Sequence, residues 1–398
     1  MAKVVTFGCR LNTYESQVIK DLVDEENVII FNTCGVTKKA SKQARQAIRK
    51  ARKENPDARI VVTGCDAQID PSKYADMQEV DQIIGNEHKF DRESYQKTDR
   101  IFVSDIMKVK EMTPHLVASF DGKVRAFIEI QNGCNHRCTF CTIPYGRGRS
   151  RSAPLQMIVN QIKLLMENGY KEFVLTGVDI THYGFDLPGR PRLGQTIKRL
   201  FNLLPDLKRL RLSSLDPSEM DEELWNLIKT DPRLLPHFHL SLQAGDDTIL
   251  KRMARRHLRS HVFEFLEFVK QHRPMATIGA DIIVGFPTET DEMFEHSVGL
   301  YEQLDMLHVF PFSAHENTPA FKMPQVDSRV IKERAKIMQG VRQDCMDRLL
   351  KRWVGKTDNV LIERIQNDVA YGKTDHFMAV KFKATDGMKV GDVLIYRH

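Results

Sequence analysis

The sequence contains no apolar run long enough to span a bilayer, and no cationic segment followed by an apolar one at its start. These absences argue against a membrane protein and against secretion, so we expect a cytoplasmic protein with no membrane partner. Structural disulfides are rare in that compartment. The seven cysteines, an odd number, therefore argue for metal or redox use of some of them.

Two other patterns are missing or rare. There is no CxxC…CxxC pattern of the kind that marks a structural zinc site. Aromatic residues make up only 8% of the chain, which suits a surface that grips phosphates better than one that stacks bases. The 398 residues, 41% hydrophobic and 28% charged, predict a globular protein of two or three domains. The net charge of +6 permits nucleic-acid binding without requiring it.

A CxxxCxxC run, Cys134, Cys138 and Cys141, follows the apolar stretch 124–131. Thiolates are soft ligands that suit iron–sulfur clusters, zinc or cuprous ion. A single zinc ion would have to be completed by His136 or by a distant residue. A cluster of four irons held by three cysteines leaves one iron open to bind a substrate, and we favour this interpretation.

With Phe140 directly before its third cysteine, the run resembles the signature of the radical S-adenosylmethionine (SAM) enzymes. The resemblance implies that the open iron binds the amino and carboxylate groups of SAM. It also implies that an electron from the cluster cleaves SAM to a 5′-deoxyadenosyl radical, chemistry that belongs to the cofactor.

The first part of the chain, residues 1–115, alternates short apolar runs with helical patterns. This alternation predicts an α/β fold with a doubly wound parallel sheet and helices on both of its faces. We expect strands at 3–8, 27–32, 59–64, 81–85 and 100–104, and helices at 14–24 and 41–55. Cys9, Cys34 and Cys65 each follow one of the first three strands, so they should meet at one edge of the sheet. We predict a second three-cysteine cluster there; three unrelated buried cysteines are the alternative.

The central part, residues 120–352, predicts a partial, open (β/α)6 barrel, the fold that radical SAM domains have. Expected strands are 124–131, 172–176, 209–213, 238–242, 276–284 and 306–312, and expected helices are 154–168, 221–230, 260–272 and 289–304. A long amphipathic helix over 327–353 closes this domain, with Cys345 as a core residue. The tail, 354–398, predicts three strands marked off by glycines, resembling the small TRAM β-barrel; an interdomain cap is the alternative.

Several strand ends of the central part resemble SAM-binding motifs. The resemblance implies cofactor contacts from Phe140, Thr176, Gly177, Val178, Asp179, Ser213, Gln243 and Ile283. Each polar residue among them has an ordinary alternative, because such residues also cap helices and form turns. We assign no side chain as a proton-transferring catalytic residue.

The stretches around Cys9, Cys34 and Cys65, including Asn12–Ser16, resemble the radical SAM methylthiotransferases over nearly the whole chain. This implies two 4Fe-4S clusters, the N-terminal one handling sulfur and the central one cleaving SAM. The residues Asn12–Ser16 resemble those found at this place in one branch of the family. Enzymes of that branch convert N6-threonylcarbamoyladenosine at tRNA position 37 to its 2-methylthio derivative. Isopentenyladenosine in tRNA, a ribosomal-protein aspartate, or a non-enzymatic iron–sulfur RNA-binding redox sensor are the alternatives.

Basic residues gather in three places, and together they predict a tRNA partner. Eight basic and no acidic side chains lie between Lys38 and Lys53. The other two groups are Arg147, Arg149 and Arg151, and Lys251, Arg252, Arg255, Arg256 and Arg259. We also expect a reducing electron donor as a partner and a monomeric protein.

Overall fold

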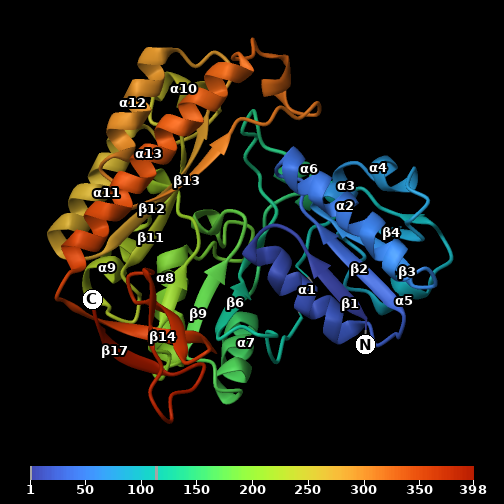
Figure 1. Ribbon diagram of the computed structural model, residues 1–398, viewed down its shortest axis with the longest axis horizontal. Helices are drawn as coiled ribbons and strands as arrows, with labels where there is room; N and C mark the ends of the chain where they lie inside the picture. The colour runs from blue at the N-terminus through green and yellow to red at the C-terminus, as the bar shows by residue number, and fades with distance from the viewer. Residues whose placement is uncertain (1, 113–114) are drawn as a thin grey trace.

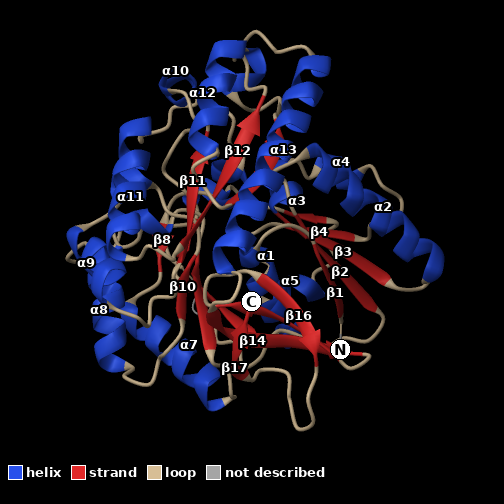
Figure 2. Ribbon diagram, turned by 60° about the vertical axis from the view of Figure 1, so that its left-hand side comes forward, coloured by secondary structure: helices blue, strands red, loops and turns tan. Residues whose placement is uncertain are grey.

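The computed structural model describes residues 2–112 and 115–398. A parallel sheet, an open barrel and an antiparallel sheet follow one another along the chain (Figure 1). Figure 2 shows their strands as three separate groups. Among the described helices, none has both the length and the apolar character needed to cross a membrane.

The N-terminal sheet has five parallel strands in sequential order: β1 (Lys3–Thr6), β2 (Val28–Thr33), β3 (Arg59–Gly64), β4 (Gln82–Ile84) and β5 (Ile101–Phe102). Alternate residues of a strand face opposite sides of the sheet. Helix α1 (Arg10–Leu22) packs on the side of Ile30, and α2 (Lys38–Glu54) on the side of Phe31. Helices therefore cover both faces, as predicted. Short helices complete the region: α3 (Cys65–Ile69), α4 (Ser72–Ala75), α5 (Arg92–Gln96) and η1 (Ile106–Lys108).

The barrel has the six parallel strands that the sequence predicts, in two hydrogen-bonded groups of three. They are β6 (Arg125–Glu129), β9 (Glu172–Thr176), β10 (Leu210–Leu212), β11 (His237–Gln243), β12 (Thr277–Val284) and β13 (Met306–Pro311). The groups run β10-β9-β6 and β11-β12-β13. A parallel bridge between Leu215 and Leu240 brings the two groups together. The open barrel is confirmed, with β6 and β13 as its two edges.

Amphipathic helices cover the outside of the barrel strands: α7 (Leu155–Glu167), α8 (Leu193–Leu203), α9 (Glu222–Thr230), α11 (Arg259–His272), α12 (Asp291–Tyr301) and α13 (Ser328–Trp353). They bury one apolar core with the strands, and Cys345 of α13 lies in it. The connections hold β7 (Gln131–Asn132), β8 (Arg151–Ser152), α6 (Ile143–Arg147), α10 (Asp247–Arg252) and the 3-10 turns η2 (Ile180–His182), η3 (Pro217–Glu219) and η4 (Pro319–Lys322).

The tail forms a four-stranded antiparallel sheet in the order β16-β15-β14-β17, one strand more than the sequence predicts. The strands are β14 (Thr357–Gln366), β15 (Val369–Thr374), β16 (Ala379–Lys383) and β17 (Val393–Arg397). The strand that was missed, β15, contains Gly372, which we interpreted as a turn. A Cβ at this glycine would lie 2.4 Å from the carbonyl oxygen of Leu361, so the close approach of β14 explains the residue.

Candidate functional site

Cys9, Cys34 and Cys65, here called the N-terminal trio, lie at the carboxyl edge of the first three strands. Cys9 precedes α1, Cys34 follows β2, and Cys65 begins α3 directly after β3. Because β1, β2 and β3 are neighbours in register, their carboxyl ends bring the three thiols to one edge. The structure thus places these residues together, as the strand pattern predicts.

Two glycines let the backbone carrying this trio pack closely. Gly8 has φ +98°, and a Cβ there would lie 2.8 Å from the sulfur of Cys34. Gly64 has φ +96°, and a Cβ there would lie 2.4 Å from the backbone of Thr33. Both positions therefore require glycine, for conformation and for space.

The thiols of the N-terminal trio act on one another electrostatically. Burial raises the pKa of Cys34 to about 12, and the neighbouring Cys65 and Cys9 add to the increase. Burial also raises the pKa of Cys65, while the guanidinium of Arg147 acts in the opposite direction. Ligand thiols must lose their protons when metal binds, so a cation here favours the ligand form.

Arg147 reaches this trio from α6 of the barrel region and is almost completely buried. It donates to both carboxylate oxygens of Glu15, at 2.8 and 3.0 Å, and to Asn12 at 2.6 Å. Lys89 forms a second ion pair with Glu15, at 2.7 Å. Asn12 and Glu15 belong to the stretch Asn12–Ser16 that carries the family resemblance. They thus fix the position of the Arg147 guanidinium.

Cys134, Cys138 and Cys141, here called the central trio, lie in the loop after β6 and β7. The loop is held by backbone hydrogen bonds, including Cys134 N to Gly148 O at 3.0 Å and Thr139 N to Met253 O at 3.0 Å. Burial raises the pKa values of Cys134 and Cys141 to about 12. The backbone hydrogen bonds fix the course of the loop that carries the three thiols.

The described residues hold candidate ligand groups for a single ion as well as the two cysteine trios. Three triads of His, Cys, Asp or Glu have their ligand atoms within 4.8 Å of one another in the described part of the chain, and neither cysteine trio is one of them. In a four-iron cluster each cysteine binds its own iron, so the sulfurs lie farther apart than around one ion. His136, the candidate further zinc ligand, lies 2.8 Å from Asp179, and these two residues form one of the three triads together with Cys134.

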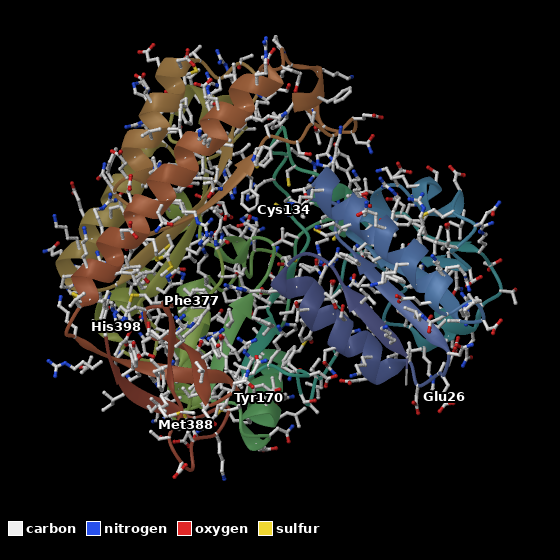
Figure 3. All side chains as sticks on the ribbon, viewed as in Figure 1. Glu26, Cys134, Tyr170, Phe377, Met388 and His398 are labelled. Atoms are coloured by element: carbon white, nitrogen blue, oxygen red, sulfur yellow. The ribbon has the colours of Figure 1, made fainter. Side chains whose placement is uncertain are left out.

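A cavity lies beside Cys141 of the central trio and extends to the residues that follow Cys34. Its walls come from the central loop (Phe140, Cys141), from the barrel strands (Gln243, Asp281, Ile283, Phe310, Phe312) and from the residues after Cys34 (Val36, Thr37). The hydroxyl of Thr142 donates to the carbonyl of Gly35 at 3.1 Å, so the neighbour of Cys141 is bonded to the neighbour of Cys34. Figure 3 shows Cys134 where the barrel meets the N-terminal region.

Three of the eight expected SAM contacts, Phe140, Gln243 and Ile283, line this cavity beside Cys141. Gln243 has φ +73° and lies at an irregularity in the register of β11 and β12. A left-handed conformation at a residue other than glycine stores strain, and such residues gather at functional sites. Gln243 is therefore held with its side chain at the cavity at some cost to stability.

The other five expected contacts, Thr176–Asp179 and Ser213, lie outside the cavity walls. The amides of Val178 and Asp179 both donate to the side-chain oxygen of Gln131, at 2.9 and 2.8 Å. The Asp179 carboxylate is 4.0 Å from the sulfur of Cys134. Ser213 is buried, and its hydroxyl has no hydrogen-bond partner among the described residues, which leaves it available to a ligand.

The sequence did not identify a role for Arg255 beyond a basic surface. Its guanidinium lies 3.7 Å from the sulfur of Cys138 and 3.0 Å from Asp216. Burial opposes the charge, but Asp216 and Cys138 together raise the pKa of Arg255. The positive charge of Arg255 thus favours thiolates in the central trio, as the charge of Arg147 does in the N-terminal trio.

For two of the three basic groups, the prediction of an exposed surface is therefore partly wrong. Arg147 and Arg151 are buried, and only Arg149 of that group is exposed. The partners of Arg147, Glu15 and Asn12, are 132 and 135 residues away in the sequence, so charge spacing could not reveal them. On α2, by contrast, Lys38, Lys39 and Lys42 are exposed, as a phosphate-binding surface requires.

The barrel and the two trios define a radical SAM enzyme with an additional cysteine-bearing N-terminal domain. Residues 128–300 match the model of the Radical SAM superfamily. Residues 1–85 match the model described as "Uncharacterized protein family UPF0004".

Curated relatives give the particular family. The chain is 55% identical over 385 residues to "Threonylcarbamoyladenosine tRNA methylthiotransferase MtaB" of Rickettsia prowazekii (strain Madrid E), covering 95% of this chain and 90% of that one. It is 37% identical to the protein of the same name in Aquifex aeolicus (strain VF5), covering 90% and 91%. It is 31% identical to "tRNA-2-methylthio-N(6)-dimethylallyladenosine synthase" of Bacillus subtilis (strain 168), covering 95% and 79%. This chain belongs to the MtaB family of methylthiotransferases.

Among solved structures, the fold is similar to that of the radical SAM methyltransferase TsrM from Kitasatospora setae. The TM-score is 0.57 at 15% identity, covering 78% of this chain and 69% of that one. The radical SAM enzyme OxsB gives a TM-score of 0.51 at 13% identity, covering 83% and 50%. These similarities concern the fold alone.

Proposed function

We propose that this protein replaces the hydrogen on carbon 2 of N6-threonylcarbamoyladenosine, at position 37 of tRNA, with a methylthio group. The single observation that carries the proposal is the cavity that joins Cys141 to the residues after Cys34, where Thr142 and Gly35 are hydrogen-bonded. A nucleotide in that cavity would lie beside Cys141 and beside the residues that follow Cys34. The family supplies the reaction and the name of the substrate.

We assign the N-terminal trio and the central trio as ligands of one 4Fe-4S cluster each. When bound, the central cluster would supply the electron, one SAM the 5′-deoxyadenosyl radical and a second SAM the methyl group, while the N-terminal cluster would hold the sulfur. An aromatic C–H bond is too strong for ordinary acid–base chemistry, which explains the need for a radical. We place the domain boundaries at 1–115, 120–352 and 354–398, the last one TRAM-like.

The chain's own residues favour thiolates and exclude water. Arg147 and Arg255 bring one buried positive charge to each trio. Phe140, Ile283 and Phe312 give the cavity apolar walls, which keep water from a reactive intermediate. Phe140, Thr176–Asp179, Ser213, Gln243 and Ile283 are our candidates for holding SAM, with Gln243 and Ser213 as hydrogen-bonding groups.

For tRNA, the exposed lysines at the start of α2 lie directly after the cavity residues Val36 and Thr37. Phosphates held there would guide the anticodon loop toward the cavity. We also propose a cytoplasmic location, a monomer, and a reducing electron donor.

Two measurements test the proposal. Anaerobic reconstitution should give about eight irons per chain, four for each of two clusters, and 5′-deoxyadenosine from SAM under reductant. Mass spectrometry of tRNA nucleosides from cells lacking the protein should show loss of the 2-methylthio derivative of N6-threonylcarbamoyladenosine. Loss of the isopentenyl derivative instead would contradict the substrate.

A further inference from the structure

The ring of Phe377 is surrounded by four cations that come from all three regions of the chain. The distances to the ring centroid are 5.8 Å for Arg10, 5.4 Å for Arg125, 5.1 Å for Arg211 and 3.6 Å for Lys373. Figure 3 shows Phe377 where the C-terminal sheet meets the barrel. The beginning of α1, where Arg10 lies, faces the barrel strands in Figure 1.

Acidic partners neutralise two of these cations. Arg211 donates to Glu172 at 2.6 Å, and Arg125 pairs with both Glu172 and Glu363, the latter at 2.8 Å. Arg10 and Lys373 form no ion pair and no side-chain hydrogen bond within residues 2–112 and 115–398. The site therefore has an excess of positive charge.

Arg10 comes from the start of α1, and its charge interacts with Asp281 of β12, which is one of the cavity walls. Arg10 is half-buried and directly follows Cys9. Asp281, the carboxylate whose charge favours the ionised form of Arg10, already holds His239 and His308 at 3.0 Å each. An unpaired charge that is partly removed from water is costly, so a site of this kind fits an anion supplied by a ligand.

We propose that Arg10 is a specificity-determining residue whose guanidinium binds the carboxylate of the substrate's threonylcarbamoyl group. This inference rests on the proposed function. A guanidinium matches a carboxylate with two parallel hydrogen bonds. A substrate with an apolar N6 substituent would leave the cation unpaired, and leaving a buried polar group unpaired is an effective way to reject a ligand.

An RNA phosphate is the rival anion. Arg10 lies inward beside Cys9, whereas the exposed cations that suit a phosphate backbone, such as Lys42, lie on α2. The strength of a phosphate contact would also not depend on the N6 substituent of the substrate. The two anions therefore predict different responses to neutralisation of the substrate carboxylate.

The test uses the full-length holoenzyme and three anticodon stem-loop RNAs: one with N6-threonylcarbamoyladenosine at position 37, one with its neutral methyl ester, and one with unmodified adenosine. Binding is measured by fluorescence anisotropy. The wild type should prefer the carboxylate RNA to the ester by about tenfold or more, the range for a hydrogen bond to a charged group. Arg10→Gln should bind both equally, and Arg10→Lys should keep part of the preference.

Arg329→Gln is the matched control, because it also removes one positive charge, from a side chain that is 90% exposed on α13. It should leave the preference unchanged. Equal weakening of all three RNAs by Arg10→Gln would indicate a phosphate contact and overturn the proposal. So would a wild type that binds acid and ester equally, a comparison that needs no variant to fold. Methylthiolation of the carboxylate RNA by the wild type tests the proposed function separately.

Discussion

The two cysteine trios are assembled in different ways. The central trio comes from one loop, Cys134 to Cys141, whose own short length brings its sulfurs together. The N-terminal trio spans Cys9 to Cys65 and is assembled by three neighbouring strands. The central trio therefore depends on local sequence, and the N-terminal trio on correct pairing of the sheet.

The trios also differ in how they depend on the rest of the chain. Arg255, beside Cys138, comes from the same barrel region as the central trio. Arg147, beside Cys65, comes from the barrel although its trio belongs to the N-terminal sheet. The N-terminal site is thus completed by a neighbouring region, and damage to the barrel should affect both trios.

The largest expected effect separates the two trios chemically. Cys141→Ala should reduce both SAM cleavage and methylthiolated product to background, because the cluster that contacts SAM is lost. Cys65→Ala should also abolish the product but should leave SAM cleavage. Each variant should retain about four of about eight irons. Iron analysis and chromatography of 5′-deoxyadenosine check this, and loss of SAM cleavage in Cys65→Ala would contradict the division of roles.

Removing Arg147 should be the largest effect on stability. Arg147→Met leaves Glu15, in a fully buried site, with Lys89 as its one remaining ion-pair partner among the described residues. Breaking a buried ion pair costs about 3–5 kcal/mol, and urea unfolding should show a loss of this order. Arg149→Met, at an exposed neighbour, should change the free energy of unfolding by less than about 0.5 kcal/mol. Similar losses in the two variants would argue against the network.

Thr142→Val tests the connection between the trios with a smaller change. It keeps the shape of the side chain but removes the hydrogen bond to the Gly35 carbonyl. An unsatisfied buried acceptor costs about 1–3 kcal/mol. We expect both clusters to remain and the yield of product per SAM cleaved to fall, measured in single turnovers. Thr142→Ser, which retains the hydroxyl, should restore the yield; if it does not, the hydrogen bond is not the cause.

The smallest effects concern tRNA. Lys42→Gln, on the helix that follows Cys34, and Lys251→Gln, on the helix that precedes the contact of Met253 with the central loop, should each reduce the slope of log affinity against log salt by about 1. Lys50→Gln, whose side chain pairs with Glu54 on the same helix, should change the slope little. Filter binding at several salt concentrations measures this. If only one of the Lys42 and Lys251 variants had a reduced salt slope, the RNA would contact only the side of the protein where that lysine lies.

The strands and helices could be predicted from the sequence because each one depends on residues that are close together in it. The six barrel strands and the long helix α13 follow from apolar periodicity alone. Strand β15 was missed because Gly372 is required by contact with β14, which no local pattern encodes.

The candidate site divides in the same way. The spacing of Cys134, Cys138 and Cys141, and the position of Cys9, Cys34 and Cys65 after strands, are properties of the sequence by itself. Which cations are free was decided only by the tertiary structure. Arg147 is buried against Glu15, while Arg10, beside Phe377, has no ion pair in the part of the chain that the structure describes. The physical reason is that a charge is neutralised by whatever the fold brings near it, and those partners come from distant parts of the chain.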